Sequence, residues 1–421
     1  MKRSERKIQS ATNWKFILGL LCVVFLVASG ILLAEKINDS VKIKAKSTKT
    51  SIVQKKKTSS SPNGVQTARI MANGDLLYHD LLYMSALQSD GTYDFTENYQ
   101  YVKPWLKKAD LVLGDFEGTI RPNYPLAGYP LFNAPESVVS AIKDAGYQVV
   151  DLAHNHILDS QLEGVFSTAK AFEQHGITPI GVYTHENRDK SSLVIKKVNG
   201  IKIALLAYSY GFNGLEENIS HADYNHHLSD LNEEKMKKEI KQAEKEADIT
   251  VVMPQMGVEY QLEPTQEQKT LYHKMIEWGA DIIFGGHPHV VEPSEVVKQN
   301  GQKKFIIYSM GNFISNQRIE TMDGVENKKW TERGVLMDVT VEKSKKGTII
   351  KDVQAHPSWV SRVAKGTYSP EGYPLYTYQT YILEDFIEGG KYRNQLDQAT
   401  KERIDTAYQE MNEHVNLKWD E

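Results

Sequence analysis

Carboxylate, amide and imidazole side chains gather at several places along this 421-residue chain, each just after a short apolar run. The residues are Asp75, Asp115, Glu117, His154, Asn155, His156, Asp159, Gln255, Glu259, His287, His289 and Asn312. Oxygen and imidazole ligands without thiolate suit hard to borderline divalent metals. Two such ions about 3.5–4 Å apart lower the pKa of a shared water and neutralise charge on a phosphoryl oxygen. A histidine that binds no metal could protonate the leaving group.

Each of these places also has a simpler interpretation. An Asp after a strand commonly closes a turn or caps a helix, and Asn commonly occupies a turn in left-handed geometry. A His-x-His pair such as His287 and His289 is a weak signal when it stands alone. The recurrence of such residues at successive strand ends favours one shared metal site over a series of separate turns.

The elements that must position these side chains alternate along the chain. Expected strands span residues 68–72, 110–113, 148–152, 177–180, 201–208, 249–253, 281–284 and 304–308, and expected helices span 135–145, 164–175, 228–246 and 265–278. This alternation predicts an α/β fold with a largely parallel, layered sheet, whose functional crevice lies at the carboxyl ends of the strands. After about residue 317 we expect β-hairpins at 334–341 and 348–354, then a helix at 396–414.

Residues 16–34 contain no charged side chain and are rich in Leu, Val and Ile. At about 1.5 Å per residue, a helix of this length nearly spans a hydrocarbon core of about 30 Å. We expect one N-terminal transmembrane signal anchor, with residues 1–15 as a cytoplasmic tail and the body extracellular, which makes a single-pass cell-membrane protein. A cleavable signal peptide is the alternative. The only cysteine, Cys22, lies in this run, which excludes a disulfide scaffold or a thiolate zinc site in the body.

The net charge of −4 combines two oppositely charged parts. Residues 1–66 contain 13 of the 50 basic and three of the 54 acidic side chains, a balance of +10, so the remainder carries −14. Residues 35–66, with eight Lys and many Ser and Thr, predict a flexible stalk that either lies against anionic lipid or wall polymer or is only a soluble spacer. The overall 40% hydrophobic and 25% charged residues exclude wholesale disorder and a polytopic membrane protein.

The ordered motifs resemble those of a known family. Asn73-Gly74-Asp75, Asp115-Phe116-Glu117-Gly118, the segment 153–159, Gly257-Val258-Glu259-Tyr260, Gly286-His287-Pro288-His289 and the segment 308–313 follow the order seen in the bacterial capsule and poly-γ-glutamate biosynthesis proteins of the CapA/PgsA family. The resemblance covers about residues 68–316. It implies a calcineurin-like metallophosphatase domain at 67–316, a four-layer α/β/β/α sandwich, with 317–421 completing or flanking it.

The resemblance also implies roles for individual residues. Asp75, Glu117, Asn155, His287 and His289 would be metal ligands, and His156 would be the acid or transition-state stabiliser, with Asp159 beside it. Supporting or substrate-binding positions are Asp115, His154, Gln255, Glu259 and Asn312. Three positions depart from the family pattern: Gln255 and Leu77 stand where a histidine is usual, and His154 stands where an asparagine is usual. One or two ions of Mn, Mg, Zn or Fe therefore remain open.

The leading functional hypothesis is a membrane-anchored capsule biosynthesis or export protein with a metal-dependent phosphoesterase-like site. Its partners would be an anionic envelope polymer, poly-γ-glutamate or polysaccharide, or the phosphorylated intermediate of that polymer, and subunits of a membrane synthase. Nucleic acid is not expected. A non-catalytic subunit that guides or tethers polymer, and a cell-wall polymer hydrolase using the same site, are the alternatives.

Overall fold

The computed structural model describes residues 64–421, apart from residues 186, 187 and 192. The predicted cytoplasmic tail and membrane segment, and nearly all of the predicted stalk, lie outside the described residues. Among the helices of the described part, none combines the length and the apolar character that crossing a bilayer requires.

The larger of the two described sheets places parallel strands from the first half of the chain beside antiparallel strands from the last quarter. Its order is β14 (Pro374–Ile382), β13 (Gly347–Tyr368), β12 (Arg333–Ser344), β1 (Gln66–Leu77), β2 (Leu111–Glu117), β3 (Val149–Asp151) and β4 (Thr178–Ile180), with β11 (Asn312–Ile314) also paired to β1. Strands β1 to β4 are parallel, and β12 is antiparallel to β1. The C-terminal residues therefore belong to the same sheet as the first strand.

The second sheet has a parallel centre and antiparallel edges. Its order is β5 (Val194–Val198), β6 (Ile201–Ser209), β7 (Ile249–Gln255), β8 (Ile282–Phe284), β10 (Gln302–Ile307) and β9 (Ser294–Gln299). Strands β6, β7, β8 and β10 run parallel, while β5 and β9 are antiparallel to their neighbours. The carboxyl ends of its parallel strands carry several of the predicted site residues.

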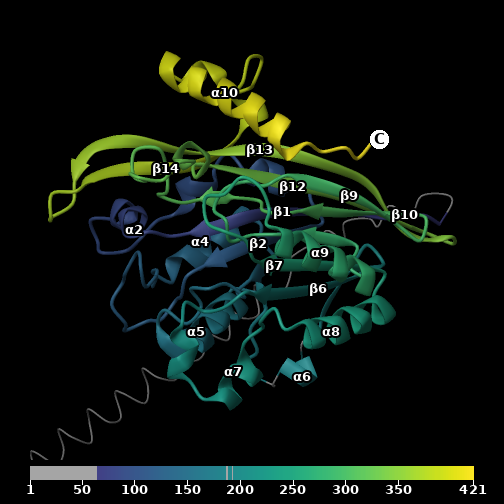
Figure 1. Ribbon diagram of the computed structural model, residues 1–421. Coiled ribbons are helices and arrows are strands. Elements are labelled where there is room, and N and C mark those ends of the chain that lie inside the picture. Colours follow the sequence, from purple (N-terminus) through teal and green to yellow (C-terminus); the bar gives the residue numbers. More distant parts are fainter. Residues whose placement is uncertain (1–63, 186–187, 192) are drawn as a thin grey trace, which may run out of the picture. The chain divides into compact units, whose positions relative to one another are not determined.

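Alternating side chains on the strands assemble the apolar cores of the described residues into four layers. Ile70 of β1 packs between the sheets with Ile203 and Val251 of the second sheet. Its neighbour Met71 faces the opposite side, where α4 (Ser137–Ala145) and α5 (Gln161–Gln174) cover the first sheet. The far face of the second sheet is covered by α8 (Glu233–Glu246) and α9 (Gln266–Trp278). The order helix, sheet, sheet, helix follows from the two-residue period of the strands, and the elements are labelled in Figure 1.

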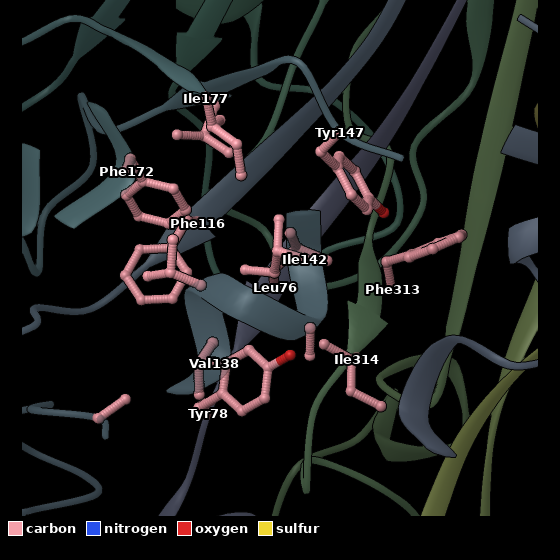
Figure 2. Close-up of a cluster of buried hydrophobic side chains, with 14 of the residues drawn as sticks. Leu76, Tyr78, Phe116, Val138, Ile142, Tyr147, Phe172, Ile177, Phe313 and Ile314 are labelled. Carbon is pink, nitrogen blue, oxygen red and sulfur yellow. The ribbon is translucent and has the colours of Figure 1, made fainter. Parts of the chain in front are cut away.

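The core beneath α4 and α5 backs the strands that carry the predicted ligands. Figure 2 shows Leu76 and Phe116, which alternate with site residues on β1 and β2, among helix residues such as Val138 and Ile142. Since successive side chains of a strand point to opposite faces, this packing fixes the direction of Asp75, Asp115 and Glu117.

Helix boundaries follow the local capping residues. The predicted helix at 265–278 begins after Thr265, whose side chain accepts from Gln268 N while Gln268 caps in return, and it ends at Gly279. The predicted start at residue 228 was wrong, because Asn232 caps α8 by accepting from Lys235 N. The other described helices are α2 (Asp80–Ala86), α3 (Lys103–Leu106), α6 (Arg188–Ser191), α7 (His221–His227), α10 (Gln398–Val415) and the short 3₁₀ turns η1 (Thr96–Tyr99), η2 (Leu215–Asn218), η3 (Lys328–Trp330), η4 (Leu383–Asp385) and η5 (Arg393–Gln395).

Strands β1 and β2 extend further than their apolar runs predict. Asp75, Asp115 and Glu117 lie within these strands, whereas the sequence places them in turns after the strands. Both strands continue because each has a neighbour to bond: Asp75 is in register with Asp115 on one side and with Asn312 on the other. Gly74 permits this, since a Cβ at that position would lie 1.9 Å from Gly311 O.

Candidate metal centre

Asp75, Glu117 and His289 form a compact buried group with metal-ligand spacing. One ligand atom from each lies within 4.8 Å of the others. Nδ1 of His289 donates to Oδ2 of Asp75 at 2.8 Å and lies 3.8 Å from Oε2 of Glu117. The group joins β1, β2 and the loop after β8, so residues more than 200 positions apart in the sequence meet here.

The oxygens of this group have unused bonding capacity. Among the described residues, Oδ1 of Asp75 and both carboxylate oxygens of Glu117 are buried without a hydrogen-bond partner. Burial, followed by the charges of Asp75 and Asp115, raises the pKa of Glu117 well above its usual value. Buried carboxylates without a donor are costly, and a divalent cation would satisfy their charge and their lone pairs together. The residues present therefore fit a divalent metal.

A second acidic cluster, Asp115 and Asp151 in register on β2 and β3, lies beside the first. The Gln255 side chain donates from Nε2 to Oδ2 of Asp115, while Oδ1 of Asp115 and Oε1 of Gln255 have no partner among the described residues. Burial, then the charges of Asp151 and Asp75, raises the pKa of Asp115 well above its usual value. The amide of Gln255 thus occupies the position where the family resemblance leads one to expect an imidazole. Gly286 is needed here, since a Cβ would lie 2.7 Å from Gln255 Nε2.

The loop that carries His287 and His289 is held in a strained backbone conformation. Their φ angles are +95° and +58°, in the left-handed region that residues other than glycine seldom adopt. The loop is fixed by two hydrogen bonds: Tyr260 N donates to Pro288 O at 2.8 Å, and Asn312 Nδ2 donates to His289 O at 3.2 Å. Asn312 therefore supports the site by holding a ligand-bearing loop.

His287 is buried outside the compact group. Its ring lies 4.5 Å from that of Tyr210 and 6.2 Å from that of His289. Burial lowers its pKa to about 3, so the ring is the neutral form that binds metals. Nδ1 of His287 is without a partner among the described residues, as is the buried Oδ1 of Asn155. Both residues thus present a ligand atom, although the described structure gathers only Asp75, Glu117 and His289 within 4.8 Å.

His156 and Asp159 form a hydrogen-bonded pair at the edge of the centre. Nδ1 of His156 lies 2.7 Å from Oδ2 of Asp159, which also accepts from Phe132 N at 2.6 Å. The Phe132 ring meets His156 edge-on at 4.8 Å. His154, whose Nδ1 accepts from His156 N at 3.2 Å, braces the backbone of the same turn. The His156 ring is therefore fixed in orientation by a carboxylate, as a general acid requires.

Two of the histidines described above line one pocket of about 430 Å³. His156 and His289 line it together with Glu259 and Tyr260. Glu259 is exposed, in contrast to the buried carboxylates, and borders the opening. The predicted site residues thus divide into the compact group of Asp75, Glu117 and His289, the further buried donor atoms of His287 and Asn155, the hydrogen-bonded pair of His156 and Asp159, and the exposed carboxylate of Glu259.

Three residues at this site were missed at the sequence level. Asp151 ends β3 and was counted as part of an apolar strand, although a carboxylate in such a run is itself a signal. Tyr210 follows β6 as the other site residues follow their strands, and contacts His287. His79 lines the pocket, and burial lowers its pKa to about 3. No spacing in the sequence links His79 to the other residues.

Comparison with known proteins places these observations in context. A family model described as bacterial capsule synthesis protein PGA_cap matches residues 69–317. The capsule biosynthesis protein CapA of Bacillus anthracis is 34% identical over 229 residues, which are 52% of this chain and 54% of that protein. The PGA biosynthesis protein CapA of Bacillus subtilis strain 168 is 34% identical over 228 residues, 52% of this chain and 57% of that protein. The chain spans about half the length of these curated relatives.

Solved structures with a similar chain path include phosphoesterases. A phosphatase from Mycoplasma pneumoniae is 13% identical with a TM-score of 0.42, covering 70% of this chain and 94% of that one. A putative 5′-nucleotidase from Staphylococcus aureus, 13% identical, has a TM-score of 0.42 and covers 69% and 54%. The calcineurin-like phosphoesterase YfkN from Bacillus subtilis, 13% identical, has a TM-score of 0.37 and covers 70% and 90%.

Proposed function

The chain belongs to the bacterial capsule synthesis protein family PGA_cap, and from that premise we propose that it is a metal-dependent phosphoesterase of capsule formation. The observation that carries the proposal is the buried group of Asp75, Glu117 and His289, which has unpartnered oxygens and whose His289 lines the same pocket as His156. The proposed substrate is an anionic envelope polymer or its phosphorylated intermediate.

The chain's own residues would divide the work as follows. Asp75, Glu117 and His289 would hold one divalent ion, and Asn155, His287 and Asp115 are the nearest candidates for a second. When bound, the metal would supply an activated water and neutralise charge on the phosphoryl group. Its identity among Mn, Mg, Zn and Fe is open, because carboxylate, amide and imidazole ligands suit all four.

His156 would act on the leaving group. Asp159 engages Nδ1 of His156, which leaves Nε2 as the ring atom for substrate. As the water oxygen bonds to phosphorus and its proton leaves to solvent, the ester P–O bond breaks and the leaving oxygen takes the proton held on Nε2 of His156. Asp159 fixes the tautomer and stabilises the charged ring, while Phe132 limits its rotation.

The test uses the full chain and two variants. Elemental analysis and hydrolysis of bis(4-nitrophenyl) phosphate are measured for wild type, His289→Ala and the control His273→Ala, whose partner is Glu295 on the protein surface. We expect bound metal and hydrolysis in wild type and control, with both lost in His289→Ala. Absence of metal and activity from the wild type, or equal activity in all three proteins, would refute the enzymatic proposal.

We further propose a single-pass cell-membrane protein whose body is extracellular and which works beside membrane synthase subunits, without nucleic acid. The uncharged run at 16–34 and the similarity to capsule and PGA biosynthesis proteins support this placement. Protease added to intact cells should digest the body, whereas protection until the cells are lysed would contradict it.

A non-catalytic role is the second candidate, favoured by one observation. Gln255 donates to Asp115 and so ties up an oxygen that a second metal would need. In this version the fold guides or tethers polymer for a synthase. Capsule formation restored in a deletion strain by His289→Ala as fully as by wild type would establish it, and failure of that variant to restore capsule favours catalysis.

A further inference from the structure

One wall of the pocket that contains His156 and His289 is apolar. Leu77, Phe132, Met322 and Val325 line it, and Tyr129 stands at its opening. These side chains come from β1, the β2–α4 loop and the segment after β11, so three separate segments contribute apolar surface to the pocket. A phosphate group alone would need none of this surface.

The β2–α4 loop, which contributes Tyr129 and Phe132 to the pocket, also carries exposed apolar side chains. Tyr124, Leu126, Tyr129 and Leu131 are exposed by 38%, 37%, 79% and 46%. Clustered exposed apolar side chains of this kind mark interaction sites in soluble proteins. Tyr129 belongs to both the loop and the pocket, whereas Tyr124 and Leu131 line a separate hollow.

The loop is held firmly despite its exposure. Ala127 and Asn133 exchange backbone hydrogen bonds of 3.0 and 2.9 Å. The Asn133 side chain accepts from Arg121 N at 2.8 Å and reaches the carbonyl oxygens of Tyr124 and Pro125 at 3.2 and 3.1 Å. The apolar side chains are therefore presented by an anchored backbone, which lowers the entropy cost of binding to them.

The charges around the pocket argue against a polycarboxylate in this place. Among the described residues that line it, none is Lys or Arg, and Glu259 adds a carboxylate at the rim. A chain of repeated carboxylates would meet repulsion from Glu259 with no compensating cation beyond the metal. An uncharged apolar chain attached to one phosphate meets no such penalty.

We propose that this pocket takes a lipid-type phosphate ester: its phosphoryl group faces His289 and His156, and its alkyl chain lies on Phe132, Met322 and Tyr129. This inference rests on the proposed function and specifies its substrate class. The phosphorylated intermediate would then be an amphiphile with one charged end, and the extended anionic polymer would be excluded from the pocket.

The test measures chain-length dependence on the full chain loaded with Mn²⁺. Methyl, butyl and hexyl 4-nitrophenyl phosphodiesters are compared for kcat/KM, and the corresponding monoalkyl phosphates are compared for Kd by calorimetric titration. Each methylene buried on the wall is worth about fourfold, the equivalent of about 0.8 kcal/mol. We expect the hexyl-to-methyl ratio to exceed tenfold in wild type and to fall at least threefold in Tyr129→Ser.

Tyr368→Ser is the matched control, because Tyr368 is 69% exposed near the β13–β14 turn and does not line this pocket. Its ratio should equal that of wild type. Hydrolysis without chain-length dependence overturns the inference and leaves the proposed function standing. If no ester is hydrolysed, the titrations decide the question. A Kd that falls with chain length and depends on Tyr129 supports the inference. An equal Kd for all chain lengths, or tighter binding of a γ-glutamyl oligomer, overturns it.

Discussion

At the scale of single residues, the centre concentrates buried carboxyl groups that the protein supplies with few hydrogen-bond donors. Asp75, Asp115, Glu117 and Asp151 are all buried, and burial is the largest cause of the raised pKa of the last three. Such a cluster destabilises the metal-free fold and stabilises the metal-bound one. Removal of one of these carboxylates should therefore weaken metal binding and raise the stability of the metal-free fold.

Glu117→Gln tests this opposition. Loss of a buried, unpartnered charge should raise the free energy of unfolding of the metal-free protein by about 1–3 kcal/mol. The stabilisation by added Mn²⁺, about 2.7 kcal/mol at a hundredfold excess over Kd, should largely disappear. Urea unfolding of full chain with EDTA and with Mn²⁺ measures both quantities.

Glu342→Gln is the control, since Glu342 lies half-buried on β12, in register with β1 at Thr67. It should leave the Mn²⁺ effect intact. A Glu117→Gln protein that is less stable than wild type in EDTA and equally stabilised by Mn²⁺ would show that Glu117 is no ligand.

Residue identity predicted much of this centre, and burial explains the rest. Asp75, Glu117 and His289 stood out because each follows an apolar run and each is a metal-ligand type. Asp151 was missed because its strand is short and apolar, and only the pairing of β2 with β3 brings it to Asp115. The contact of Gln255 with Asp115 joins two strands of different sheets, which no local pattern contains.

At the scale of elements, the close approach of β1 to the segment before β11 sets the geometry of the ligands. Asp75 N donates to Gly311 O at 3.0 Å, and a Cβ on Gly74 would lie 1.9 Å from that same oxygen. Gly74→Ala should cost about 1–3 kcal/mol or more in unfolding free energy by overpacking, and should weaken metal binding by displacing Asp75. Thermal unfolding and elemental analysis report the two effects.

Gly211→Ala is the matched change, because the nearest atom to a Cβ there is Glu216 Oε1 at 3.9 Å. It should have little effect on either measurement. Equal behaviour of the two variants would mean that β1 can move away from Gly311 without consequence for the site.

His356 of β13 contributes to the stability of the fold by an amount that depends on pH. Burial alone would lower its pKa, but the carboxylates of Asp338 and Glu384 raise it to about 9; Glu384 Oε1 lies 2.8 Å from Nδ1. A raised folded pKa stabilises the fold below the unfolded value of about 6.5, and this contribution is lost as pH rises to about 9. It amounts to about 3 kcal/mol.

His356→Gln should therefore lower the unfolding free energy by about 3 kcal/mol more at pH 6 than at pH 9.5. Urea titrations at both pH values measure the difference, with His185→Gln as control because the His185 side chain is 80% exposed. A loss that is the same at both pH values would assign His356 a packing role only.

Element predictions succeeded where capping residues and apolar runs agreed. The helix predicted at 265–278, between Pro264 and Gly279, agrees with α9 within a residue, whereas Asn232 was overlooked as the cap of α8. The apolar runs of β1 and β2 ended before the strands did, because Asp75, Asp115 and Glu117 are kept in the strands by pairing with neighbours. Pairing is a property of the sheet and cannot be read from one segment.

At the scale of the whole molecule, the residues beyond the family match are structural parts of the same sheet. The match ends at residue 317, yet β12 pairs with β1 along Gln66–Asn73, and Arg69 forms an ion pair with Asp338. Met411 and Val415 of α10 complete the core between the sheets. Figure 1 shows α10 above β13.

A chain ending at Gln317 should consequently fail to fold. Without β12, the central strand β1 becomes an edge strand whose backbone groups on that side have no partner. The core residues Ile70 and Ala72 are also exposed, which favours aggregation. Solubility on expression and cooperative unfolding by circular dichroism are the measurements, with the full chain as reference. A soluble, cooperatively unfolding product of this length would show that the C-terminal strands are dispensable.

The long separation between site residues also sets a timetable for synthesis. Asp75 and its partner His289 are 214 positions apart, so at roughly 5–20 residues per second the ribosome needs about 10–40 s to pass from one to the other. During that interval the early carboxylates exist without the imidazole, and a cation that meets them is held by an incomplete set of donors. Asp75 therefore meets His289 only late in synthesis, and the fold that holds the two together waits further for β12, which pairs with β1.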